Sequence, residues 1–138
     1  MRRIALLLLA AGSVLAQTFV VRLTPVPIDA AMRATVTGMG TASATLNDRT
    51  LTVNGSFEGL RSPATIAQIH QGPAMGVRGP VLFDLTVSKA TEGSISGTFK
   101  LTPGQVENLL KGKLYIQIHS EKAPDGNLWG WLLLEEKR

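Results

Sequence analysis

Two identical Gln-Ile-His triplets hold the side chains of this sequence that are best suited to chemistry. The chain contains two histidines, His70 and His119, and each closes one of these triplets. Because alternate residues of a β-strand share a face, Gln68 would lie beside His70 and Gln117 beside His119. Imidazole nitrogens bind copper and zinc, and side-chain amides can orient a ligand or a water molecule. These four side chains are therefore candidates for one polar site.

Metal binding is one interpretation of this pattern. Structural zinc usually has four protein ligands and catalytic zinc has three, so two histidines leave the site incomplete. Asp84, Glu121 or Asp125 would have to supply a further ligand. In the alternative interpretation, both histidines are structural and bond to backbone groups near the strand ends.

Each triplet lies in a short run that is typical of a β-strand. The first run covers residues 65–71 and the second covers residues 114–120. Apolar side chains such as Ile69 and Ile116 alternate with the polar ones, so each strand would have one face for a core and one Gln/His face. If the two strands are neighbours in a sheet, their polar faces can converge into one site.

Further runs of this kind continue along the chain. They cover residues 18–23, 41–46, 51–57, 81–87, 94–101 and 128–134. Turn residues separate the runs, with a hairpin turn at 47–50 and a further turn at 123–126. This pattern predicts an all-β fold, which would be an antiparallel sandwich or barrel of about eight strands, immunoglobulin-like or superoxide-dismutase-like.

One short helix is predicted near residues 103–111. Thr102 has the position of a cap, Pro103 follows at the first helical position, and Gln105 lies three residues after the cap. Apolar residues then follow at spacings of three and four, and Gly112 ends the element. The capping residues thus predict where this helix begins.

The first sixteen residues have the pattern of an export signal. Residues 1–3 include two arginines, residues 4–11 are apolar, and the small residue Ala16 ends the segment. The apolar run is shorter than the roughly 20 residues that span a bilayer, so we expect cleavage near Ala16 rather than an uncleaved anchor. The mature protein would be one domain, residues 17–138, in the periplasm or outside the cell. Its contact with the membrane would be through the export signal alone.

Charge and cysteine content exclude several classes of function. The chain has no cysteine, which excludes cysteine nucleophiles and zinc–thiolate sites. Of the 14 basic residues, 12 remain once Arg2 and Arg3 are removed, against 10 acidic residues, and they form no basic stripe. Nucleic acid is therefore not an expected partner. No carboxylate pair or nucleophile motif indicates catalysis, so we expect that the protein is not an enzyme and has no cofactor, unless copper or zinc binds.

The connection between residues 71 and 80 is a candidate for partner binding. It is longer than a hairpin needs, and loops of this kind often carry function. Gln71, Pro73, Met75 and Arg78 are its candidate partner-binding residues. The expected partner is an extracellular or envelope protein, or an envelope polymer.

Trp129 and Trp131 share one face of the last predicted strand. Leu133 continues that face, and Leu132 and Leu134 continue the other. Because both faces are apolar, we expect the two indoles to be buried against a second layer. The alternative is an exposed binding strip, which would stack on a sugar ring or on a partner.

The residues around the first triplet resemble the central signature of a known family, the CHRD (chordin-type) domain. That family shows a His-x-His segment followed by Gly-Pro-Ala, then a Gly-Pro-Val run into a strand, and residues 70–74 and 79–81 are similar. The resemblance extends in order over residues 20–135. It implies an all-β module of the envelope or the extracellular space, and in chordin such domains belong to a secreted antagonist of growth factors. Gln68 stands where many members have the first histidine, which removes one potential metal ligand.

A fainter similarity links the chain to copper-zinc superoxide dismutase. In that enzyme, too, a later strand ends in histidine before an acidic loop, as residues 118–123 do here. Two histidines do not supply the full ligand set of that enzyme. We therefore expect a non-catalytic binding or structural module of the CHRD type, and a copper- or zinc-binding protein is the alternative.

Overall fold

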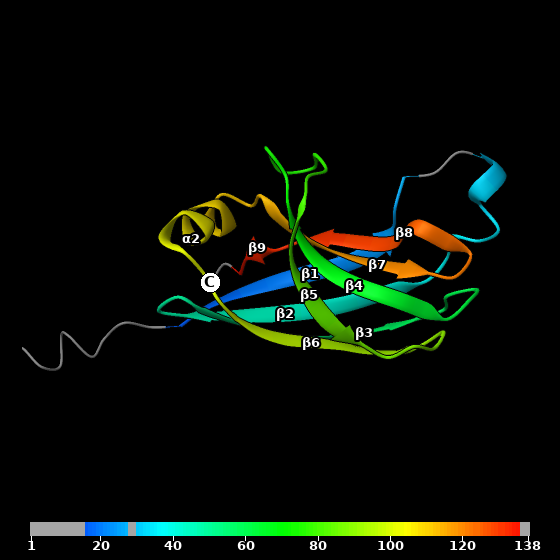
Figure 1. Ribbon diagram of the computed structural model, residues 1–138, viewed down its shortest axis with the longest axis horizontal. Coiled ribbons are helices and arrows are strands. Elements are labelled where there is room, and N and C mark those ends of the chain that lie inside the picture. Colours follow the sequence, from blue (N-terminus) through cyan, green and yellow to red (C-terminus); the bar gives the residue numbers. More distant parts are fainter. Residues whose placement is uncertain (1–15, 28–29, 136–138) are drawn as a thin grey trace, which may run out of the picture.

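Eight antiparallel strands close into a barrel in the computed structural model, which describes residues 16–27 and 30–135 (Figure 1). The strands are β1 (Gln17–Pro25), β2 (Met39–Asn47), β3 (Thr50–Glu58), β4 (Ala64–Gln71), β5 (Val81–Val87), β6 (Gly93–Lys100), β7 (Leu114–Ser120) and β8 (Ala123–Trp131). A two-residue strand, β9 (Leu133–Leu134), follows the last of them. The all-β fold expected from the sequence is confirmed, whereas the leader lies, except for Ala16, outside the described residues.

The barrel closes at two places where few residues pair. Around it the strand order is β1-β2-β3-β6-β5-β4-β7-β8, and β8 returns to β1. The β2–β3 hairpin is paired along its whole length, from Met39 with Glu58 to Asn47 with Thr50. By contrast, two residue pairs join β1 to β8, and two join β5 to β6. These two lines of sparse pairing divide the barrel into two sheets.

The inner face of the barrel holds the hydrophobic core. Alternate residues of each strand point inward, as the strand geometry requires. Phe19 and Leu23 of β1 and Ile116 and Ile118 of β7 are fully buried in it. Burial of a side chain of this size contributes about 1.5–3 kcal/mol, so a chain without disulfides depends on these contacts for its stability.

Two helical segments lie at opposite ends of the barrel (Figure 1). Helix α2 (Pro103–Leu110) begins with the predicted capping box, in which Thr102 and Gln105 bond reciprocally, and its Leu109 enters the core. At the other end is the 3-10 helix η1 (Ala30–Met32), near a small second cluster around Val26. Neither segment of the described chain is long enough and apolar enough to cross a membrane.

The predicted turn at 123–126 is wrong, because these residues begin β8. Ser120 pairs with Ala123, so the turn consists of Glu121 and Lys122 alone. The amide of Glu121 donates to the carbonyl of Pro63, and the amide of Lys122 donates to a serine hydroxyl. Ala123 is fully buried at the start of β8. The strand therefore begins before the Pro-Asp-Gly sequence and not after it.

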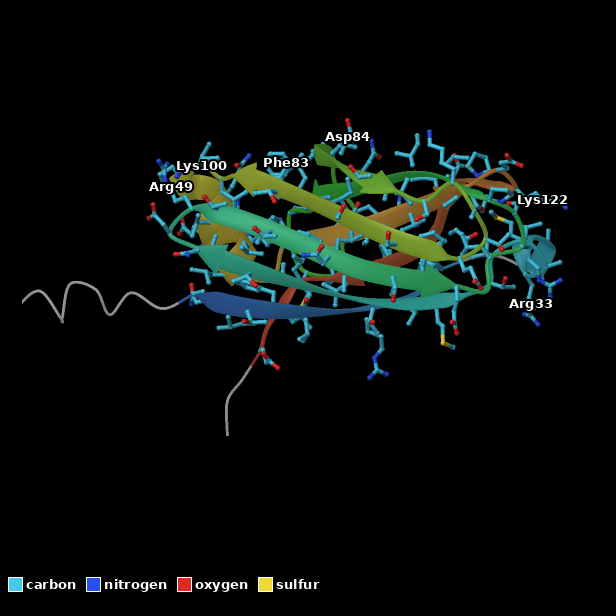
Figure 2. The ribbon with its side chains drawn as sticks, turned by 90° about the horizontal axis from the view of Figure 1, so that it is seen from below. Arg33, Arg49, Phe83, Asp84, Lys100 and Lys122 are labelled. Atoms are coloured by element: carbon cyan, nitrogen blue, oxygen red, sulfur yellow. The ribbon has the colours of Figure 1, made fainter. Side chains whose placement is uncertain are left out.

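Basic side chains are distributed over both ends of the barrel. Figure 2 shows Arg49 and Lys100 at one end and Arg33 and Lys122 at the other. This distribution agrees with the scattered charge seen in the sequence.

Candidate functional site

The two triplet strands are neighbours, as their sequences suggested. In the β4–β7 ladder Gln68 lies opposite Gln117, whereas His70 lies opposite Tyr115. The apolar residues between them are buried in the core, so the Gln/His faces of both strands point out of the barrel. His119 lies opposite Ile66, four residues along the ladder from His70, which corresponds to about 13 Å of strand.

His70 is held in one tautomer by the loop that follows its strand. Its Nδ1 lies 2.9 Å from the carbonyl oxygen of Gly79, which can only accept, so Nδ1 carries the proton. The ring stacks on Tyr115, with centroids 4.9 Å apart, and its Nε2 is buried without a hydrogen-bond partner. Burial lowers the pKa of His70; the Gly79 hydrogen bond opposes this, and electrostatic repulsion from His119 and Arg78 adds to the lowering.

A chain of hydrogen bonds links the loop to the second histidine. Arg78 donates to Oε1 of Gln117 at 3.0 Å. The amide nitrogen of Gln117 lies 3.3 Å from Nε2 of His119, and Nδ1 of His119 lies 2.7 Å from the carbonyl of Pro124. Since that carbonyl accepts, His119 carries its proton on Nδ1, and the Gln117 amide donates to Nε2. Both histidines therefore donate to backbone carbonyls, as the structural interpretation expected.

Three aromatic rings extend this polar layer across β7 and β8. Tyr115 contacts Trp131 at a centroid distance of 4.4 Å and Trp129 at 5.7 Å. The guanidinium carbon of Arg78 lies 4.9 Å from the centre of the Trp129 ring, within the range of a cation–π contact. We call His70, Tyr115, Gln117, Trp129, Trp131 and Arg78 the outer aromatic cluster.

The expectation that both tryptophans are buried under a second layer is wrong. Trp129 and Trp131 are half-buried on the outside of the barrel, and Leu133 is 44% exposed. The apolar run at 128–134 suggested two buried faces, but the barrel needs only the inward one for its core. Arg78 covers part of the outer face instead of a second sheet.

The 72–80 loop brings one of its predicted partner-binding residues into this cluster. Arg78 bonds to Gln117, as described above, whereas Pro73 and Met75 are exposed. Gln71 is half-buried at the base of the loop, and its Oε1 is buried without a partner. The loop is also tied down by Tyr115, whose hydroxyl accepts from the amide of Gly79 and lies 3.2 Å from its carbonyl.

The acidic residues that were considered as further metal ligands do not gather around the histidines. Asp84 accepts a hydrogen bond from Gln68 at 2.9 Å, and Glu121 and Asp125 are exposed. Within residues 16–27 and 30–135, no group of three or more metal-ligating side chains could hold an ion. Copper or zinc binding at His70 and His119 stays a prediction, and the stagger of the two histidines does not favour it.

A groove runs along the outer surface where β1 meets β8. It has a volume of about 360 Å³, and we call it the seam groove. Its lining residues are Val20, Arg22, Thr24, Trp129, Gly130, Trp131 and Leu133. Gly130 is required here, because a Cβ at this position would collide with the carbonyl oxygen of Arg22. Sequence reasoning missed the β1 side of this groove, although the alternation of residues 18–23 marks Val20 and Arg22 as outward-facing.

The fold and the site together define a class of protein: an antiparallel β-barrel with a packed aromatic and polar cluster on its outer face. Within this class the chain belongs to the CHRD domain family, whose model matches residues 14–132. The expected resemblance is thus confirmed. CHRD domains occur in extracellular and secreted proteins. No curated protein and no solved structure matches the chain.

Proposed function

We propose that this protein is an exported, non-catalytic binding module of the CHRD type, and that it binds an envelope component through its outer aromatic cluster. The observation that carries the proposal is the position of Trp129 and Trp131, which stay partly exposed on the outside of the barrel, in contact with the buried ring of Tyr115. The main core does not include these two indoles, and although Trp129 also packs against the small cluster around Val26, both remain partly open to solvent.

The composition of the cluster supports a role in binding. Tyrosine, tryptophan and arginine are the residue types that contribute most binding energy at protein interfaces. Here the Arg78 guanidinium lies against Trp129, and both side chains remain open to solvent in part. The loop that carries Arg78 is held by Tyr115, so the surface is ordered before a partner arrives and little entropy is lost on binding.

Retention on isolated envelope material tests this proposal. We expect the purified protein to be retained, and Arg78→Ala to reduce retention about ten-fold, because it removes a charge and a stacking contact from the cluster. Arg49→Ala is the matched control, since Arg49 lies at the β2–β3 turn at one end of the barrel (Figure 2). Equal retention of the two variants, or no retention of the wild type, would refute the proposal.

Export is tested separately by the N-terminus of the protein recovered outside the cytoplasm. We expect cleavage after Ala16, so that Gln17 is the first residue. An intact Met1 in the exported fraction would contradict this part of the proposal.

A second candidate function, copper or zinc binding, is favoured by the buried Nε2 of His70. This nitrogen has no partner, and its ring is oriented by a carbonyl at Nδ1, as the rings of metal-ligating histidines usually are. Calorimetric titration with each metal tests it, with His70→Ala and His119→Ala measured singly. Sub-micromolar binding lost in both variants would support one shared site, and absence of binding would exclude this candidate.

A further inference from the structure

The seam groove differs from the rest of the surface in the kind of polar group that it presents. Three of its lining residues, Arg22, Trp129 and Trp131, carry hydrogen-bond donors, namely a guanidinium and two indole N–H groups. Within the described part of the chain, none of these donors has a protein acceptor. Thr24 adds a hydroxyl, and no carboxylate lines the groove. A ligand that satisfies these groups must be rich in acceptors, and a negative charge would complement Arg22.

The walls of the groove are mostly apolar and include a flat aromatic surface. Tyr115 packs against Trp131 from the β7 side, whereas the groove lies on the β1 side of the same ring. On β1 and β9, Val20 and Leu133 are paired and both are 44% exposed. The C–H face of a sugar ring has the shape and polarity to stack on such an indole, while its hydroxyls stay at the rim.

We propose that the seam groove binds the carboxylated pyranose units of an acidic polysaccharide. Trp131 is the stacking surface, and Arg22 pairs with the carboxylate, for which the planar guanidinium fork is suited. This inference rests on the proposed function and names the chemical class of the envelope component. Arg78 lies over Trp129, which is one of the lining residues, and adds a second positive charge.

The geometry favours a linear polymer over a single small ligand. The groove is open at the surface and follows the direction of β1 and β8, with exposed side chains from Val20 to Thr24 along one wall. A chain of uronic acid units presents one carboxylate per ring, so a polymer can slide in register until one carboxylate meets Arg22. The larger hollow beside Met39, of about 520 Å³, is unsuited to such a ligand because Glu58 and Glu92 line it.

Single-stranded nucleic acid also combines flat rings with negative charge, and it stacks on aromatic side chains. Its affinity depends on several phosphate contacts along the strand. The seam groove offers two cations, Arg22 in its wall and Arg78 over Trp129, and the other basic residues labelled in Figure 2 lie at the ends of the barrel. We therefore favour the acidic polysaccharide, and the nucleic acid becomes a control in the experiment.

The test is a titration of the purified protein with hexamers of galacturonate and of mannuronate, followed by tryptophan fluorescence and calorimetry. The fully methyl-esterified hexamers are neutral controls of the same shape, and a thymidine hexanucleotide is the nucleic-acid control. We expect one acidic hexamer to bind at least ten-fold more tightly than its ester and than the oligonucleotide. Added salt should weaken binding, because a charge pair contributes to it.

Two arginine variants locate the site. We expect Arg22→Gln to weaken binding about ten-fold or more, which is the size of effect that loss of a charge-assisted hydrogen bond produces. Arg49→Gln removes the same charge at one end of the barrel and should leave binding within about two-fold of the wild type, since charges more than a Debye length apart are screened. Thermal unfolding of both variants shows that the fold is intact.

Several results would overturn the inference: equal binding of acid and ester, tighter binding of the oligonucleotide, no binding of either acid, or an unaffected Arg22→Gln variant. If envelope retention still depends on Arg78 in that case, the proposed function stands and the ligand is of another class. If retention fails as well, both proposals fall.

Discussion

His70 shows how a single buried side chain can be fixed in one protonation state. Its Nδ1 donates to the Gly79 carbonyl, and its ring stacks on the Tyr115 ring. A second proton on Nε2 would be a buried donor without an acceptor, near the positive charge of Arg78. The neutral form is therefore part of the folded structure.

The lowered pKa of His70 predicts a pH dependence of stability. In the unfolded chain a histidine takes up its proton near pH 6.5, whereas in the folded protein His70 takes it up only at lower pH. Between these two values the unfolded state binds more protons, so the free energy of unfolding falls as the pH falls below about 6.5. Above that pH both states are neutral at this residue and the effect is absent.

Urea unfolding of the wild type and of His70→Asn between about pH 5 and pH 8 measures this effect. Asparagine keeps a donor for the Gly79 carbonyl but does not titrate. The wild type should therefore lose stability relative to His70→Asn as the pH is lowered. Parallel pH curves for the two proteins would show that burial of His70 does not lower its pKa.

At the scale of elements, the 72–80 loop is the segment that connects the core to the outer aromatic cluster. Its two ends meet through glycines: a Cβ on Gly79 would collide with the carbonyl oxygen of Gln71 and lie 2.7 Å from the Cα of Gly72. The amide of Gly72 donates to the carbonyl of Lys113, which fastens the loop to the residue directly before β7, the strand that carries Tyr115. The narrow base of the loop thus sets the position of Arg78.

Gly79→Ala should therefore displace the loop and destabilise the protein by about 2–3 kcal/mol, through backbone overlap and loss of the bonds to His70 and Tyr115. Gly104→Ala is the control, because the nearest atom to a Cβ there is 4.0 Å away in the first turn of α2. That substitution should be neutral or stabilise by up to about 1 kcal/mol. Similar urea midpoints for the two variants would show that the loop base tolerates a side chain.

The elements were predictable because their signals are local. The alternation in residues 65–71 and 114–120 predicted β4 and β7, and the reciprocal bonds of Thr102 and Gln105 form the cap that the sequence indicated. The register between strands depends on contacts far apart in the sequence. Nothing local in either triplet indicates that His70 lies opposite Tyr115 rather than opposite His119.

The same limit explains why the partial exposure of the two tryptophans was not predicted. Residues 128–134 are apolar at every side chain, so a local pattern cannot distinguish a strand buried on both faces from one at the edge of a groove. The outcome was decided by barrel closure, which places Trp129 and Trp131 beside the outward residues of β1. Arg22 became a candidate binding residue for the same reason.

For the molecule as a whole, the two sparsely paired lines of the barrel are where it should open first. Two residue pairs join β5 to β6, at Thr86 and Val87. On the other side, β1 pairs with β8 at Thr24 and Pro25 and with β9 at Phe19 and Val20, and residues 21–23 between them have no partner in either ladder. Local opening has a low free energy where few hydrogen bonds and contacts must break.

Amide hydrogen exchange should therefore show lower protection along both lines than in the fully paired β2–β3 hairpin. An acidic hexamer in the seam groove would contact β1 and β8 together, so its binding should raise protection at the β1–β8 line by mass action. The β5–β6 line lies opposite the β1–β8 line in the strand order around the barrel. Its protection should not change, which makes it an internal control. Protection that rises equally at both lines would mean that the ligand stabilises the barrel globally, and protection that rises at neither would place the ligand outside the groove.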